Sequence, residues 1–310
     1  MAAAIPHQLT VAVTGASGFV GRTLVRRLGA MEGITCRACY RSAPSAPPPG
    51  CDVQVTGDLL DGEGWGPALA GADAVVHTAA RAHVMQETAA DALAAYRRMN
   101  VEGTLSIAGA AAEAGVRRFV FLSTAKVNGE GTPIDSPFTE DDPPAPQDPY
   151  AVSKLEAEQG LWAIQRMTGM AVVVLRPPLV IGPDAKGNIA RLRRWITRGL
   201  PLPLGAIANL RSVISLDSLC DVIAAALVRE AAANQTYLVA DADLSTPDLV
   251  RQLADELGRP AHLIPVPTGI LRLAGRLARR DAEVDRLVGS FRVDASRAQR
   301  DLGLGGPASG

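Results

Sequence analysis

The sequence predicts an α/β fold, a doubly wound parallel sheet with a smaller, interleaved substrate region toward the C-terminus. Three observations predict it: short apolar runs recur through the first half, helix-forming segments separate them, and a glycine-rich turn follows the first run. The chain has 310 residues, of which 47% are hydrophobic and 20% charged, so it can bury a sizeable core.

Five apolar runs lack the polar alternation of a half-exposed strand, and we predict strands buried on both faces. They lie at residues 9–14, 34–40, 74–78, 119–123 and 172–175. The segments between them are rich in Ala, Leu, Glu and Arg, which favours connecting helices and a parallel sheet. Residues 88–114 predict one long helix, which we expect to serve as a subunit contact in a homodimer.

The composition of the chain changes after Arg176, where Pro and Gly residues separate shorter segments. We therefore predict a first domain over residues 1–176 and a second region over 177–310. A further apolar run at residues 237–240 predicts a strand that returns to the first sheet, so the two regions interleave.

Charge and composition exclude several classes of protein. The 31 Lys and Arg nearly cancel the 32 Asp and Glu, so no broad positive field favours nucleic acid or an anionic membrane. No apolar run is long enough to span a bilayer, and residues 1–8 lack the pattern of a signal peptide, so we expect a cytoplasmic protein. Cys36 and Cys39 fall on one predicted strand at an odd spacing, so they face opposite sides as inert thiols. The His, Asp and Glu residues show no ligand spacing, and we predict no metal.

The first predicted strand runs directly into a turn that carries glycine at every third position. Gly15, Gly18 and Gly21 let the backbone approach a pyrophosphate at the start of the following helix, whose dipole favours an anion. Because the turn lies between a first strand and a first helix, it indicates a dinucleotide site rather than a plain tight turn.

A second motif begins at Asp148, which is expected to cap a helix that has Pro149 in its first turn. Tyr150 and Lys154 then stand four residues apart on one helical face. Tyrosine ionises near pH ~10, but a neighbouring ammonium and an oxidised nicotinamide both favour the phenolate. We predict that this pair exchanges a proton with a substrate alcohol.

These motifs resemble the short-chain dehydrogenase/reductase superfamily, and the second half resembles its extended branch of nucleotide-sugar epimerases, dehydratases and reductases. The resemblance covers nearly the whole chain and implies a Rossmann-type sheet. Leu175-Arg176-Pro177 through Gly182-Pro183 and Arg211 through Asp217 match segments of that branch. The resemblance implies that Thr124 holds the substrate oxygen against Tyr150. It implies cofactor contacts for Gly15, Ser17, Gly18, Phe19, Val20, Gly21, Asp58, Leu59, Ala79, Ala80, Asn100, Tyr150, Lys154 and Pro177.

The resemblance also implies a sugar-nucleotide site. Arg211 is expected to bind the diphosphate, for which a planar and permanently charged guanidinium is suited. The other residues expected to contact the substrate are His83, Thr124, Lys126, Asn128, Asn188 and Leu204.

The choice of dinucleotide depends on the end of the second strand, where an acid would bind the ribose hydroxyls and an arginine a 2′-phosphate. No acid lies between Glu32 and Asp52, whereas Arg37 and Arg41 do. We favour NADP(H) with Arg41 at the phosphate and leave NAD(H) open, the alternative being that Arg41 is a solvated surface charge.

Several functions share this machinery. Dehydratases of the branch carry an Asp-Glu pair where this chain has Ala125 and Lys126, which argues against elimination of water. The stretch from Ser123 to Glu130 more closely resembles bacterial reductases of a UDP-linked 4-keto-6-deoxy-N-acetylhexosamine, which is the function that we favour. A UDP-sugar 4-epimerase with tightly bound NAD is the alternative. A non-catalytic dinucleotide sensor is a third reading, against which the intact Tyr150 and Lys154 weigh.

Overall fold

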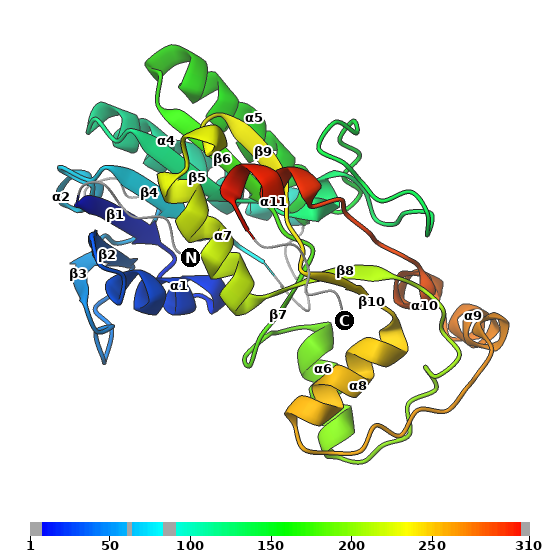
Figure 1. Ribbon diagram of the computed structural model, residues 1–310. Helices are drawn as coiled ribbons and strands as arrows, with labels where there is room; N and C mark the ends of the chain where they lie inside the picture. Colours follow the sequence, from blue (N-terminus) through cyan, green and yellow to red (C-terminus); the bar gives the residue numbers. More distant parts are fainter. Residues whose placement is uncertain (1–7, 61–63, 83–90, 305–310) are drawn as a thin grey trace.

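The computed structural model describes residues 8–60, 64–82 and 91–304. Its main feature is a seven-stranded, all-parallel sheet of order β3-β2-β1-β4-β5-β6-β9 (Figure 1). The strands are β1 (Leu9–Thr14), β2 (Ile34–Tyr40), β3 (Cys51–Val55), β4 (Ala74–His77), β5 (Arg118–Leu122), β6 (Ala171–Arg176) and β9 (Gln235–Leu238). This confirms the predicted Rossmann-type fold and the strand that returns to the sheet. The order of the strands reverses between β1 and β4, which is where such sheets open a ligand crevice.

Two apolar layers cover the sheet, one on each face. On one face the core cluster includes Leu24 of α1 (Phe19–Gly29), Leu219 of α7 (Leu216–Val228) and Ala298 of α11 (Ser296–Leu302). On the other face it includes Trp65 of α2 (Trp65–Leu69), Ile107 of α4 (Gly103–Glu113) and Leu161 of α5 (Pro149–Thr168). Because both faces are covered, the central strands carry unbroken apolar runs.

The cysteines of β2 follow this division into two layers. Cys36 belongs to the first apolar cluster and Cys39 to the second, so the prediction that they face opposite sides of a strand is confirmed. Both thiols are buried and free. Burial raises the pKa of Cys39 to about 12, which leaves its thiol protonated and unreactive at neutral pH.

The predicted long helix is interrupted. Within the described residues it runs as α3 (Ala92–Arg97), a π-helical segment (Arg98–Glu102) and α4, whereas residues 88–90 lie outside them. The π-helical turn contains Asn100, whose buried side chain bonds the neighbouring loop and helix. Such turns are frequent at functional sites.

The segment after Arg176 forms a smaller lobe around a three-stranded sheet of order β10-β8-β7. Its elements are β7 (Leu179–Ile181), β8 (Arg211–Ser215), β10 (Ala242–Leu244), α6 (Asn188–Thr197), α8 (Thr246–Glu256), α9 (Thr268–Leu277) and α10 (Asp281–Val288). A separate apolar cluster fills this lobe. We propose the division at residue 176, with α7, β9 and α11 returning to the larger sheet.

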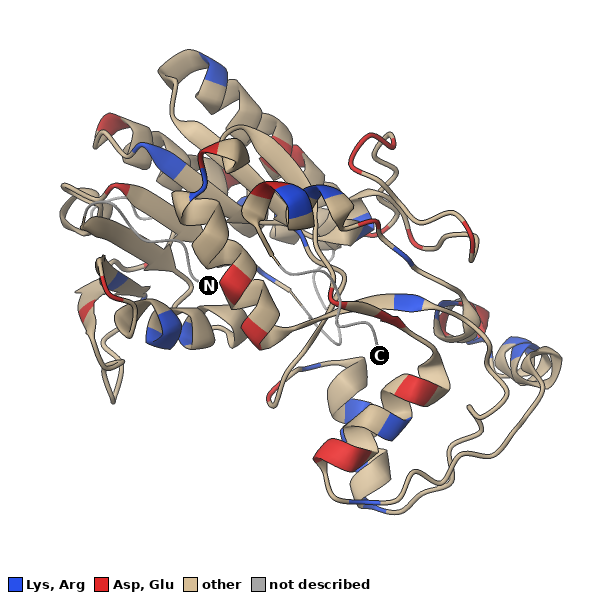
Figure 2. Ribbon diagram, in the orientation of Figure 1, with Lys and Arg blue, Asp and Glu red and all other residues tan. Residues whose placement is uncertain are grey.

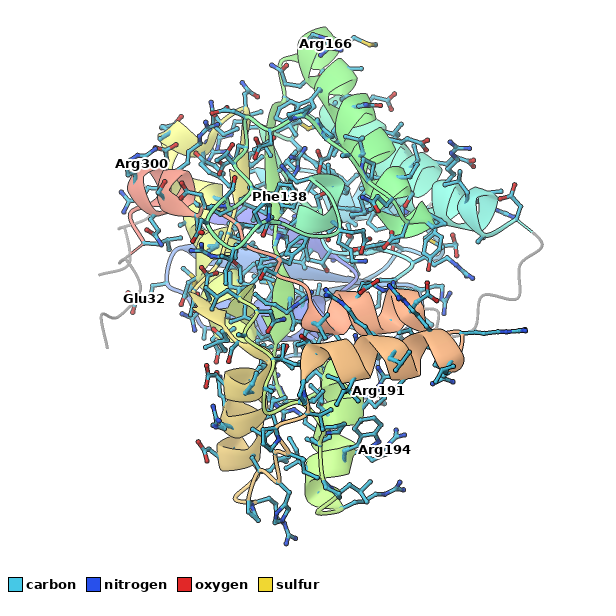
Figure 3. All side chains as sticks on the ribbon, turned by 90° about the vertical axis from the view of Figure 1, so that its right-hand side faces the viewer. Glu32, Phe138, Arg166, Arg191, Arg194 and Arg300 are labelled. Carbon is cyan, nitrogen blue, oxygen red and sulfur yellow. The ribbon has the colours of Figure 1, made fainter. Side chains whose placement is uncertain are left out.

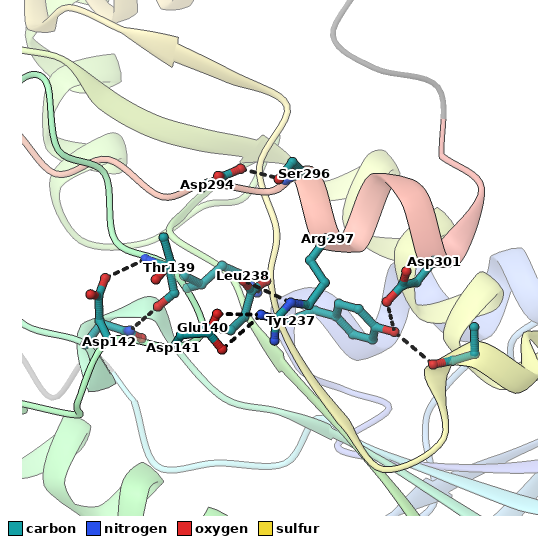
Figure 4. A network of polar contacts seen from close by, with 12 residues as sticks. Thr139, Glu140, Asp141, Asp142, Tyr237, Leu238, Asp294, Ser296, Arg297 and Asp301 are labelled. Atoms are coloured by element: carbon teal, nitrogen blue, oxygen red, sulfur yellow. Dashed lines mark hydrogen bonds and ion pairs between the residues drawn. The ribbon is translucent and has the colours of Figure 1, made fainter.

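The last helix is held against the large sheet by a polar network (Figure 4). Tyr237 of β9 donates a hydrogen bond to Asp301 of α11 over 3.1 Å, and Arg297 of the same helix pairs with Asp141 at 2.8 Å. The backbone amide of Leu238 donates to Glu140 at 3.0 Å. These bonds join the C-terminal helix, the returning strand and the loop between β5 and α5.

Candidate active site

The glycine turn lies where the loops after β1 and β4 meet. Gly15 has a φ of +69°, and a Cβ atom there would come 2.7 Å from the backbone nitrogen of Ala79. A Cβ atom on Gly21 would come 2.1 Å from the Gly15 carbonyl oxygen. The tight packing of the turn therefore requires glycine at both positions.

The start of α1 offers an anion site. The helix begins at Phe19 after Gly18, which supplies no side-chain cap, and its first turn holds no acidic residue. The first amides of the helix remain available, and the positive end of the dipole meets no competing carboxylate. These features of the chain suit the pyrophosphate of a dinucleotide.

Asn100 holds together two loops beside this turn. Its side-chain oxygen accepts from the Arg81 amide at 2.8 Å, and its side-chain nitrogen donates to the Arg81 carbonyl and to the Ser153 hydroxyl, at 3.1 and 3.0 Å. The residue is completely buried, so its role in the structure is to tie the loop after β4 to the helix of Tyr150.

The remaining residues expected at the cofactor take different places. Asp58 accepts a hydrogen bond from the Leu60 amide at 3.2 Å, and the indole of Trp65 donates to the Asp58 carbonyl, so the segment after β3 is held in a turn. Ala80 is exposed at the carboxyl edge, and the Pro177 carbonyl accepts from the Ala125 amide. Contacts of these residues with a cofactor stay predictions.

Tyr150 and Lys154 lie near the start of α5, as the sequence predicts. Asp148 caps the helix by accepting from the Ala151 amide at 2.7 Å, and Pro149 is its first residue. The Tyr150 ring packs edge-on against Tyr96, with 6.1 Å between centroids. The ammonium of Lys154 lies 3.9 Å from the centroid of the Phe121 ring, a cation–π contact inside the protein.

Burial governs the ionisation of both residues. It raises the pKa of Tyr150, and the charges of Asp148 and Tyr96 raise it further. It lowers the pKa of Lys154 to about 7, although the charge of Glu158 acts in the opposite direction. The chain by itself therefore does not provide the lowered tyrosine pKa that the sequence leads us to expect. A phenolate would form together with a positive charge on Lys154, because each ion stabilises the other.

A buried ionic network supports the catalytic helix from behind, and the sequence analysis missed it. Glu158 receives two hydrogen bonds from Arg176, one of them at 2.5 Å, and one from Ser123. Arg176 also donates to the Asn128 side chain at 3.0 Å. Glu158 follows Tyr150 by eight residues and Lys154 by four, so its place on the same helical face was the signal that could have revealed it.

The loop after β5 places three predicted residues in different surroundings. Thr124 is buried at the carboxyl edge, and its hydroxyl accepts from the Lys126 amide at 3.3 Å. The Lys126 ammonium bonds Asp148 at 2.6 Å and Glu130 at 3.0 Å. Asn128 donates to the Thr139 carbonyl in addition to accepting from Arg176. Its amide is therefore engaged by the protein, whereas the Thr124 hydroxyl still has a proton to donate.

Three further residues expected at the sugar nucleotide, Asn188, Leu204 and Arg211, come from the small lobe. Arg211 donates to the carbonyls of Arg286 and Gly289 through one nitrogen, at 2.7 and 3.2 Å, and lies against the Phe291 ring. Asn188 is exposed at the start of α6, and Leu204 is buried in the apolar cluster of the lobe. His83 lies outside the described residues. Binding by these residues stays a prediction.

The arginines at the second strand do different things. Arg37 donates to the carbonyls of Ala68 and Ala70, at 3.2 and 2.6 Å, and so holds the end of α2. Arg41 is exposed just beyond β2. The structure thus shows that Arg37 bonds the backbone at the end of α2. The lack of acidic residues in this segment of the sequence did not reveal that role.

In the described part of the chain, no group of three or more His, Cys, Asp or Glu side chains is placed to hold a metal ion. None of the helices in residues 8–60, 64–82 and 91–304 combines the length and apolarity needed to cross a bilayer.

Comparison with known proteins shows the family of the chain and several of its relatives. Residues 11–240 match the NAD dependent epimerase/dehydratase family. The chain is 40% identical over 296 residues to a UDP-glucose 4-epimerase of Vibrio cholerae, covering 95% of this chain and 90% of that protein. It is 31% identical to a 2-alkyl-3-oxoalkanoate reductase of Stenotrophomonas maltophilia, covering 81% and 77%.

Among solved structures, the UDP-glucose 4-epimerase of Thermotoga maritima superimposes with a TM-score of 0.76 at 21% identity, covering 97% of this chain and 94% of that one. That likeness shows the fold. The description of the matched family names NAD, and the preference for NADP predicted from Arg41 is not supported. The chain belongs to the NAD dependent epimerase/dehydratase family and is an enzyme of the extended short-chain dehydrogenase/reductase type.

Proposed function

We propose that this chain is a UDP-sugar 4-epimerase that works with NAD bound at the glycine turn. The observation that carries the choice of epimerase is the 40% identity with the Vibrio cholerae enzyme across 95% of the chain. Tyr150 and Lys154 would serve a reductase equally well. The pair therefore supports redox chemistry at a sugar alcohol but does not decide between an epimerase and a reductase.

In this proposal NAD, held by the glycine turn of Gly15, Gly18 and Gly21, would supply reversible hydride transfer at C4 of the sugar. Tyr150 takes the proton of the O4 hydroxyl and later gives it back, and the Thr124 hydroxyl holds the same oxygen. Lys154 stabilises the phenolate of Tyr150. Ala125 and Lys126 provide no carboxylate for removing a proton from C5, so elimination of water does not compete.

Retention of the hydrogen at C4 tests this proposal. UDP-galactose, and separately its N-acetylated counterpart, is supplied with deuterium at C4 and without added dinucleotide. We expect conversion to the gluco epimer with the deuterium retained, because the same hydride leaves and returns. Denaturing the purified protein should release NAD rather than NADP. Loss of the label, or conversion only when a reduced dinucleotide is added, would contradict the proposal.

A 4-keto reductase is the second candidate. Two observations favour it: the relative at 31% identity is named a reductase, and residues 123–130 resemble reductases of UDP-linked 4-keto sugars. In this case a 4-keto-6-deoxy sugar would consume one reduced dinucleotide per product, and deuterium from the labelled cofactor would appear at C4. The same protein sample can be used in both assays, so their comparison decides between the two candidates.

A further inference from the structure

An apolar stripe on α9 has no partner among the described residues. Ile270, Leu273 and Leu277 are 57%, 58% and 80% exposed, and they are among the large apolar side chains that the structure leaves in solvent. Their spacing of three and then four residues places them along one side of the helix. Exposed apolar side chains that gather on one face, rather than scatter singly, mark an interaction surface.

The opposite side of α9 is firmly packed. Leu271 contacts the apolar cluster of the small lobe, as do Val284 and Leu287 of α10. A Cβ atom on Gly275 would lie 2.7 Å from a methyl carbon of Val284, so the two helices pack closely (Figure 3). The helix therefore has an apolar inner side in the core and a second apolar side that faces away from it.

The charge on α9 itself is positive, whereas the neighbouring α10 carries the carboxylates Asp281, Glu283 and Asp285. Residues 268–280 contain Arg272, Arg276, Arg279 and Arg280 and no Asp or Glu (Figure 2). Arg272 forms an ion pair with Asp285 of α10 at 3.1 Å, and all four arginines are exposed. An apolar stripe bordered by arginines is the pattern of a helix that lies in the plane of a membrane interface.

We propose that the outer side of α9 docks on an anionic lipid bilayer, with Ile270, Leu273 and Leu277 entering the interface and the arginines contacting lipid phosphates. A second copy of the chain is the other occupant that an apolar stripe could take, and the experiment below separates the two. The net charge of the whole chain, from which we predict no membrane partner, does not reveal the local excess of arginine on α9.

The proposed membrane side is connected to the candidate site. Arg211 bonds the carbonyls of Arg286 and Gly289, at the end of the helix that packs against α9. Docking would therefore hold the small lobe with its expected diphosphate ligand near the bilayer. This inference does not depend on whether the enzyme is an epimerase or a reductase, since neither activity enters the argument.

Flotation with vesicles tests the proposal. The full chain is mixed with vesicles of phosphatidylcholine alone, or of phosphatidylcholine and phosphatidylglycerol. We expect binding to the anionic vesicles only, weakened by salt. Leu277→Asp should weaken it at least about tenfold, since it removes an inserted side chain and adds a repelled charge. Arg276→Gln, which leaves the apolar stripe intact, should weaken it roughly fivefold.

Met167→Asp is the matched control, because Met167 is 82% exposed and lies at the end of α5, next to Arg166 and well away from α9 (Figure 3). It should leave vesicle binding unchanged. Absence of binding to anionic vesicles, or equal losses in Leu277→Asp and Met167→Asp, would overturn the proposal. A change of oligomeric state in Leu277→Asp, measured by sedimentation, would overturn it in favour of a second copy.

Discussion

Lys154 illustrates how burial determines chemistry at the scale of one residue. Its side chain is 1% exposed and its ammonium faces the Phe121 ring, so water does not stabilise the charge. Burial lowers its pKa from 10.5 to about 7. The residue can therefore gain or lose its proton near neutral pH, which an exposed lysine cannot do.

Because Lys154 is buried, replacing it by an uncharged residue should stabilise the fold, and the size of this gain should depend on pH. The unfolded chain keeps Lys154 protonated up to a pH near 10.5, whereas the folded chain loses that proton above a pH of about 7. The free-energy cost of burying the Lys154 charge is complete below a pH of about 7. It disappears as the pH rises from there to about 10.5, by on the order of 1.4 kcal/mol per pH unit. Lys154→Met should therefore raise the free energy of unfolding most near pH 7 and least near pH 10. Denaturant titrations at several pH values measure it, and a gain that does not vary with pH would contradict it.

Tyr150 gives the second prediction at this scale. Tyr150→Phe removes the ionisable oxygen and leaves the ring that packs against Tyr96. We expect turnover of the UDP-sugar to fall by ~10²–10⁴, the usual effect of losing a positioned acid or base. Affinity for NAD, measured by calorimetry, should stay nearly unchanged. A variant with the activity of the parent protein would remove Tyr150 from the mechanism.

At the scale of the element, α5 combines the catalytic residues with their support. Tyr150, Lys154 and Glu158 follow one another at intervals of four residues, so one face of the helix carries both the reacting group and the buried anion. Asp148 caps the helix and receives the Lys126 ammonium. Burial alone would raise the pKa of Asp148, but the hydrogen bonds from Lys126 and the Ala151 amide outweigh it and hold that pKa below its usual value. The start of the helix is thereby fixed to the loop that carries Thr124.

The buried pair behind the helix predicts a large loss of stability. Glu158→Gln leaves the Arg176 guanidinium, whose side chain is 7% exposed, without a compensating charge. Removing one partner of a buried pair typically costs about 3–5 kcal/mol. Glu156→Gln is the matched control on the same helix, because Glu156 pairs with Arg97 at the surface and should change little. Thermal or denaturant unfolding compares the two, and similar losses would show that the buried charge is not what matters.

At the scale of the whole molecule, we could predict those parts of the fold that follow from a local pattern in the sequence. Residues 9–14 and 34–40 have the predicted bounds as strands, since each is a short and mainly apolar run. The edge strand β3 has partly exposed residues and gave no such run. The three-stranded sheet of the small lobe also escaped prediction, because β7 and β10 are three residues long and pair only across distant segments.

The same division holds for the candidate site. The glycine turn and the Tyr150–Lys154 pair have fixed spacings along the chain, so they could be read from it. The bonds of Glu158 to Arg176 and of Asn100 to Arg81 join separate elements and depend on the tertiary fold. Arg37 shows the limit from the other side: its place on the second strand did not reveal that its guanidinium holds the end of α2.

The last prediction concerns Arg211, which holds β8 against the end of α10 and is expected to bind the substrate diphosphate. Arg211→Ala should raise the Michaelis constant for the UDP-sugar far more than it lowers turnover. The diphosphate lies far from C4 and changes little on the way to the transition state, so its contact is uniform binding. A charge-assisted hydrogen bond is worth ~1.5–3 kcal/mol, or roughly ten- to a hundredfold in affinity.

Titration of UDP alone isolates this contact, because UDP carries the diphosphate without the sugar. Arg211 also bonds the carbonyls of Arg286 and Gly289, so the variant's unfolding must be measured alongside. Arg211→Lys keeps the charge but loses the planar fork, and should fall between Arg211→Ala and the parent protein. Arg194→Ala removes an exposed charge from the same lobe and should leave UDP affinity intact. If Arg211→Ala folds normally and binds UDP as tightly as the Arg194→Ala control, then Arg211 only holds β8 against the end of α10. The diphosphate must then bind elsewhere.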